Sequence, residues 1–162
     1  MDFRPWTLLL GQMMAAGGLE RMPARISWPL HTALRDLYLE AGRRGLLASL
    51  PAEPDFEPAP EAGLRARDAD EALADLCREG VLHRVGQLTT AALAVDPDRL
   101  VPYRRSLMSL DPEMVRLLQR AGSRWAALAS AAAKKAATPA RSSAATVVSL
   151  TDSRHEVVPA LL

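Results

Sequence analysis

Apolar residues recur every three or four positions along several stretches of the chain, which is the spacing of amphipathic helices. Proline suits the first turn of a helix because its missing N–H is not needed there. The last of these stretches runs on into alanine-rich sequence near Lys135. We therefore expect a mainly α-helical protein, with predicted helix starts near Pro5, Trp28, Asp68, Pro102 and Pro112.

Glycines interrupt this helical pattern at several positions. They should end the first three helices, because glycine favours the turn that follows a helix. The predicted stops are Gly17-Gly18, Gly42 and Gly80. Residues 81–85 and 87–90 are rich in β-forming side chains on either side of Gly86, which predicts a small β-hairpin and the only good strand candidate.

Two stretches lack a regular pattern. Residues 51–63, PAEPDFEPAPEAG, contain four prolines and four acidic residues, so we expect a mobile acidic loop there and a short helix before it, over 43–50. After Pro139 the chain turns small and polar, which predicts a flexible tail. The predicted organisation is a single helical domain over 1–137 and a tail over 138–162.

Composition narrows the class of protein. The chain has 162 residues, 49% of them apolar, which is enough for one core. No apolar run approaches the roughly 20 residues that a membrane span requires, and Asp2 with a single Arg4 makes a poor signal peptide. Cys77 is the single cysteine and no zinc-ligand spacing is present. We expect a cytoplasmic protein without structural metal or cofactor.

Charge is distributed unevenly along the chain. Residues 51–80 contain nine acidic and three basic side chains, whereas residues 81–162 contain eleven basic and six acidic ones. Arg116, Arg120 and Arg124 recur every four residues, so they should form a ridge along the last helix. Such a ridge could bind a polyanion or an acidic protein surface, or it could simply be a solvated helix face. The candidate site residues are Arg84, Arg104, Arg105, Arg116, Arg120 and Arg124.

The segment Leu73-Ala74-Asp75-Leu76-Cys77-Arg78-Glu79-Gly80-Val81-Leu82, followed by Gly86-Gln87-Leu88-Thr89-Thr90, is typical of a helix that ends at a glycine and leads into a β-hairpin. The order of elements over about residues 28–95 resembles a winged helix, the helix-turn-helix variant with a β wing. The resemblance implies a winged-helix-like centre, extended by an N-terminal helix and a long C-terminal helix. It also implies that residues 68–79 occupy the position of the DNA-recognition helix.

The charges of that helix disfavour DNA. Its carboxylates face only Arg78, and carboxylates repel a phosphate backbone. A protein-binding winged helix fits these charges better, and any contact with nucleic acid should use Arg84 and the C-terminal arginines. The acidic residues concerned are Asp68, Asp70, Glu71, Asp75 and Glu79.

Catalytic chemistry has little support in the sequence. No phosphate-binding glycine loop, zinc-protease helix or nucleophile elbow is present. Cys77 falls on the predicted buried stripe of its helix, so an inert thiol is favoured over a nucleophile activated by His83. His31 and His155 lie apart from any acidic or cysteine cluster in the sequence. The three tryptophans, Trp6, Trp28 and Trp125, are expected in the core, with Trp6 the best candidate for exposure.

Three hypotheses follow. The first is a non-catalytic adaptor or assembly subunit, whose acidic segment 51–79 and basic segment 99–141 suit a protein partner or head-to-tail self-association. The second is a nucleic-acid-binding winged-helix regulator that uses the basic ridge, with steep salt dependence. The third, an enzyme using Cys77 and His83, is disfavoured.

Overall fold

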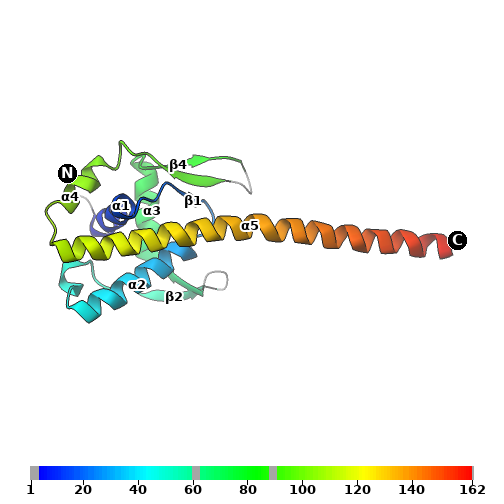
Figure 1. The fold of residues 1–162 in the computed structure, drawn as a ribbon, viewed down its shortest axis with the longest axis horizontal. Coiled ribbons are helices and arrows are strands. Elements are labelled where there is room, and N and C mark those ends of the chain that lie inside the picture. Colours follow the sequence, from blue (N-terminus) through cyan, green and yellow to red (C-terminus); the bar gives the residue numbers. More distant parts are fainter. Residues whose placement is uncertain (1–3, 60–62, 88–90, 162) are drawn as a thin grey trace.

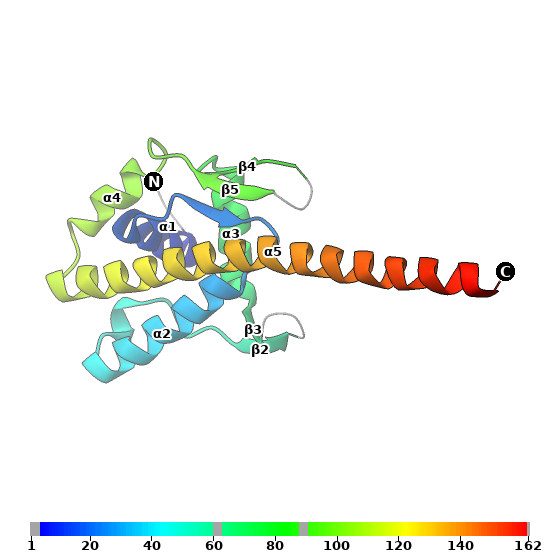
Figure 2. The same ribbon diagram turned by 45° about the vertical axis from the view of Figure 1, so that its right-hand side comes forward.

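The computed structural model describes residues 4–59, 63–87 and 91–161, and side chains within 4–58, 65–87 and 91–136. The protein is mostly helical, with two small antiparallel sheets, as the helical spacing predicted. Figures 1 and 2 show a body of short elements gathered on both sides of one long helix, α5, whose C-terminal part projects beyond the body. No helix in the described ranges is long and apolar enough to cross a bilayer.

The elements follow one another with short connections. In chain order they are α1 (Pro5–Gly17), β1 (Arg21–Pro23), α2 (Trp28–Arg44), the 3₁₀ turn η1 (Leu47–Ser49), β2 (Phe56–Ala59), β3 (Gly63–Ala66), α3 (Arg67–Arg78), β4 (Leu82–Val85), β5 (Ala92–Val95), α4 (Val101–Leu107) and α5 (Pro112–Leu161).

Two boundaries differ from the sequence prediction. The second helix continues past Gly42 to Arg44, and it is Gly45 that adopts the left-handed backbone conformation after the helix, at φ 69°. At the start of α3, Asp68 and Asp70 lie inside the first turn and Ala66 is the cap residue, with no side-chain cap bond. The predicted short helix over 43–50 is reduced to η1.

Helix α1 lies at the centre of the body and crosses α5 at glycine. A Cβ atom added to Gly17 would lie 2.1 Å from the carbonyl carbon of Gly122, and one added to Gly122 would lie 2.0 Å from the carbonyl oxygen of Met13. The two backbones are therefore in direct contact. On another side of α1, a Cβ at Gly11 would meet the ring of Tyr103 in α4 at 2.2 Å.

The hairpin predicted after Gly80 forms, but with a different second strand. Strand β4 pairs with β5, from Leu82 opposite Val95 to Val85 opposite Ala92. The prediction had placed the second strand at 87–90, of which 88–90 lie outside the described residues. Strand β5 is also the middle strand of a sheet ordered β1-β5-β4, so it pairs with a strand on each side. The winged-helix resemblance stays a prediction.

Residues 51–63 also differ from the expected irregular loop. Phe56–Ala59 forms β2, which pairs with β3 in register from Phe56 opposite Ala66. Proline argues against a central strand because it cannot donate to the ladder, but β2 has only one strand beside it. Pro58 therefore occupies an edge strand. Strand β1, which ends at Pro23, was missed for the same reason.

The last helix is longer than predicted. Its backbone is helical through Leu161, where the sequence predicted a flexible tail over 138–162. Alanine is the strongest helix former, and it recurs along α5 as far as Ala145; the helix includes Pro139 and Pro159. Residue 162 and the side chains from 137 onward lie outside the described residues.

The core lies where α1 and α2 pack against the first half of α5 and where α3 packs against α1. Trp125 of α5 is fully buried, as predicted, whereas Trp6 and Trp28 are only half-buried. Trp6 stacks on Tyr38 with ring centroids 5.9 Å apart. The aromatic ring of Trp6 thereby ties the start of α1 to α2.

We predict that Gly122→Ala destabilises the protein by about 2–3 kcal/mol, because the new methyl group would force the α1 and α5 backbones apart. The matched control is Gly42→Ala in α2, where the added Cβ would meet only a Leu47 methyl at 3.7 Å. That control should gain roughly 0.5–1 kcal/mol from helix propensity. Urea unfolding followed by tryptophan fluorescence measures both, and equal stability of the two variants would contradict the crossing geometry.

Candidate functional site

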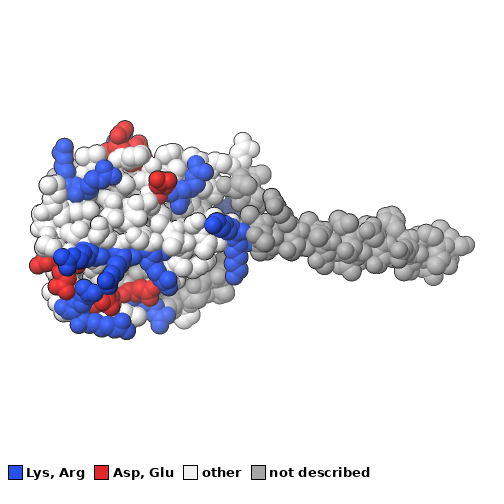
Figure 3. Space-filling model, in the orientation of Figure 1, with Lys and Arg blue, Asp and Glu red and all other residues white. Residues whose placement is uncertain are grey.

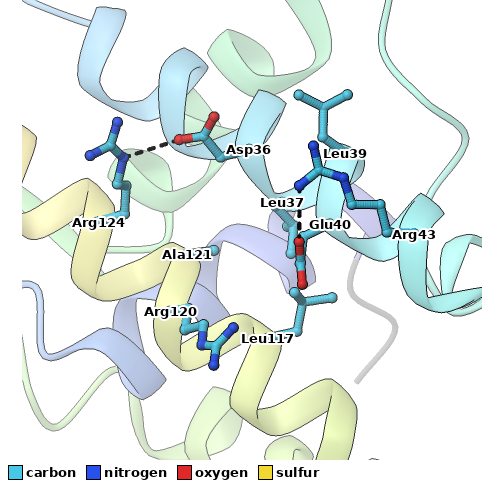
Figure 4. Close-up of a pocket in the computed structure, with 9 residues that line it drawn as sticks. All are labelled: Asp36, Leu37, Leu39, Glu40, Arg43, Leu117, Arg120, Ala121 and Arg124. Carbon is cyan, nitrogen blue, oxygen red and sulfur yellow. Dashed lines mark hydrogen bonds and ion pairs between the residues drawn. The ribbon is translucent and has the colours of Figure 1, made fainter.

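A surface groove runs between α2 and α5, with a volume of about 320 Å³. Leu37, Leu117 and Ala121 are buried and form its apolar floor, while Leu39 is 51% exposed. We call this feature the α2–α5 groove (Figure 4). Its lining residues are Asp36, Leu37, Leu39, Glu40, Arg43, Leu117, Arg120, Ala121 and Arg124.

Ion pairs hold the rim of the groove. The Arg124 Nε donates to an Asp36 carboxylate oxygen at 3.0 Å and so joins α5 to α2. On α2, Glu40 accepts from Arg43 at 3.4 Å and from Arg44 at 2.8 Å. The hydrogen bond from Arg44 is the main cause of a lowered pKa of the Glu40 carboxyl. The rim therefore presents fixed charges of both signs beside an apolar floor, and Figure 3 shows acidic and basic side chains interleaved over this part of the body.

The predicted site arginines divide between the two sides of α5. Arg116, Arg120 and Arg124 are all exposed on α5, and the last two line the groove. Arg104 and Arg105 are exposed on α4, and Arg84 is exposed on β4. Figures 1 and 2 place α4 and β4 on the side of α5 opposite α2. The six arginines therefore do not form one continuous ridge.

The acidic helix α3 exposes fewer carboxylates than its sequence suggests. Asp75 is 8% exposed; it accepts a hydrogen bond from the Thr7 hydroxyl at 3.0 Å and pairs with Arg4 and Arg78. Asp70 pairs with Arg65 and His31. Both carboxylates are therefore paired with other side chains of the protein.

Glu79 accepts a hydrogen bond from the Tyr103 hydroxyl at 2.8 Å, and burial with this bond raises the pKa of Tyr103. Asp68 and Glu71 remain exposed on α3.

An acidic hairpin leads directly into the first turn of α3. Glu53, Asp55 and Glu57 are exposed on and just before β2, and β3 ends at Ala66, one residue before α3 begins. A phosphate backbone that approached the start of α3 would meet these carboxylates, which would repel it.

Cys77 does not lie on the buried stripe predicted for it. The thiol is exposed, and Asp75 takes the buried position instead, because α3 turns the Asp75 carboxylate toward Thr7 of α1. Partial burial still raises the pKa of the Cys77 thiol, which disfavours the reactive thiolate at neutral pH. Within the described residues, Cys77 and His83 share no hydrogen bond, and no group of three His, Cys, Asp or Glu could hold a metal ion.

A second pocket, of about 360 Å³, lies between α1, η1 and the start of α5. Leucine and proline side chains line most of it, and Gln12 at its wall donates to the Ser106 hydroxyl at 3.0 Å. Met108 and Leu47 belong to neighbouring segments and are 87% and 43% exposed. The residues that line this pocket carry no charge, unlike those that line the α2–α5 groove.

His31 belongs to a buried polar cluster that sequence reasoning missed. The side chain is 1% exposed, its Nδ1 accepts the Ala66 N–H at 3.2 Å, and its Nε2 lies 3.3 Å from an Asp70 oxygen. Because Nδ1 is an acceptor, the neutral ring carries its proton on Nε2. The cluster ties α2 to β3 and α3. Its members are distant in sequence, so no local motif could have indicated it.

Comparison with known proteins finds no matching family model, no similar curated protein and no similar solved structure.

We predict that the protein loses stability as the pH falls below about 6.5. Burial lowers the pKa of His31 below its ordinary value, an effect that the opposing attraction of Asp70 does not cancel. The unfolded chain therefore takes up this proton at a higher pH than the folded chain does. The loss should level off once folded His31 is protonated, with a slope of at most about 1.4 kcal/mol per pH unit.

Urea unfolding at several pH values between about 5 and 8 measures this slope, above the range in which carboxylates titrate. His31→Gln is the matched variant, since an amide can also accept from Ala66 and donate to Asp70. The free energy of unfolding of the His31→Gln variant should not show this dependence on pH. Parallel curves for the two proteins would show that His31 is not responsible.

Proposed function

We propose that the protein is a non-catalytic binding subunit that receives a protein segment in the α2–α5 groove. The observation that carries the proposal is the combination of an apolar floor, the half-exposed Leu39 and a rim of fixed charges. Protein interfaces commonly have an apolar centre with a polar rim, and arginine is enriched in them. Of the two sequence-predicted arginines at the groove, Arg124 is paired with Asp36, so a contact between Arg120 and a carboxylate of the partner is the one that supports the proposal.

The preferred partner presents apolar side chains together with charge. Asp36 and Glu40 lie along α2, and the three guanidinium groups of the lining belong to Arg43, Arg120 and Arg124. A partner segment with carboxylates toward α5 would meet complementary charge, whereas one with the reverse polarity would be repelled. The groove therefore selects both the composition and the orientation of what it binds.

Nucleic-acid binding is the second candidate. It is supported by the position of α3 directly before the β4–β5 hairpin, on which Arg84 is exposed. The exposed carboxylates around α3 argue against it. Fluorescence anisotropy of a labelled duplex at roughly 50 mM and 200 mM salt separates the two candidates. The binding-subunit proposal expects no binding at low salt, and binding that Arg116→Glu/Arg120→Glu/Arg124→Glu abolishes would favour the second candidate.

We predict that a photoreactive amino acid at position 39 crosslinks the full-length protein to a protein partner. The matched control carries the same group at position 108, which is more exposed, at 87% against 51%, but lies outside the groove. Mass spectrometry of irradiated cells identifies the adducts. A defined adduct from position 39 that is absent from position 108 is expected, because the partner covers Leu39. Equal adducts from both positions, or none from position 39, would contradict the proposal.

A further inference from the structure

Two arginines of α5 have exposed guanidinium groups with no acidic partner in the body. Within the side chains described, Arg116 and Arg120 form no ion pair or hydrogen bond, whereas Arg124 is paired with Asp36. Arg116 and Arg120 are four residues apart on one helix, so they are about 6 Å apart along its axis. The matching ligand is a pair of carboxylates with the same spacing on a second helix.

The chain carries such a pair in its own C-terminal arm, residues 137–161. After Glu113 the sequence contains only two acidic residues, Asp152 and Glu156, and they are also four residues apart. The backbone of this segment is helical, so both positions fall on one helix face.

The arm cannot reach the groove of its own chain. Helix α5 is continuous from Pro112 to Leu161 and projects away from the body (Figure 1). Along such a helix, positions 120 and 152 are about 48 Å apart. The arm that occupies the groove must therefore belong to another copy.

We propose that two copies associate through antiparallel α5 helices, with the arm of each copy lying along the α2–α5 groove of the other. In this arrangement Arg116 pairs with Glu156 of the second copy and Arg120 pairs with its Asp152. A two-fold axis near residue 136 makes every contact twice, which closes the assembly as a dimer. This inference rests on the proposed function of the groove and names its occupant.

The face of α5 between the groove and the arm allows such an approach. Ser123, Ala127 and Ser130 are exposed and continue the row that begins at Arg116 and Arg120. Small side chains let two helix axes come close, because interaxial distance depends on the side chains at the contact. The ion pairs of Arg116 and Arg120 with the carboxylates of the second copy fix the register of the two helices.

Sedimentation of the full-length protein from roughly 1 to 200 μM tests the proposal. We expect a dimer that weakens between about 50 and 500 mM salt. Arg116→Glu/Arg120→Glu should weaken dimerisation about tenfold or more, because four exposed pairs change from attraction to repulsion. Asp152→Arg/Glu156→Arg should do the same. The protein that combines all four substitutions should regain dimerisation, since the pairs are restored with opposite polarity.

Arg104→Glu/Arg105→Glu is the matched control, because it makes the same charge change on α4 and should leave dimerisation unchanged. A protein that stays monomeric throughout the concentration range would overturn the dimer, as would a fourfold variant that fails to regain association. Neither result would remove a crosslink between position 39 and a different protein. Failure of this inference is therefore distinguishable from failure of the proposed function.

Discussion

The contact between the backbones of α1 and α5 at Gly17 and Gly122 is the constraint on which the rest of the structure depends. A side chain at either position would collide with main-chain atoms of the other helix. Because α1 also packs against α3 and α4, this crossing fixes the position of α5 relative to most of the body. A helix held so firmly at one end can carry a long extension in a defined direction.

The groove depends on the same constraint. Its floor comes from Leu37 of α2 and from Leu117 and Ala121 of α5, and Ala121 directly precedes Gly122 at the crossing. The ion pair between Arg124 and Asp36 lies one turn or less from the crossing and joins the same two helices. A shift of α5 away from α1 would therefore change the width of the groove and the spacing of its charges. Packing between α1 and α5 in the core therefore determines the shape of the groove at the surface.

Local features of the structure could be predicted from the sequence, and features that need distant residues could not. Helical spacing together with Pro5 and Pro112 correctly predicted where α1 and α5 begin. The four-residue spacing of Arg120 and Arg124 correctly predicted that both lie on one face of α5. Strands β1 and β2 were missed because each contains a proline that only an edge position tolerates. The partner of Arg124 on α2 and the hydrogen bond of His31 to Ala66 join segments far apart in sequence.

The proposed dimer requires that α5 form one helix from the groove through the C-terminal arm and that a second copy cover the arm. Most of the stability of a helix in a protein comes from packing, so the amide hydrogens of the arm exchange slowly only when packing supports it. Hydrogen–deuterium exchange of the full-length protein, measured above and below the concentration at which it associates, tests this directly. We expect protection over residues 140–158 that appears on association, together with added protection at the groove. Rapid exchange of these amides at every concentration would contradict the proposed dimer.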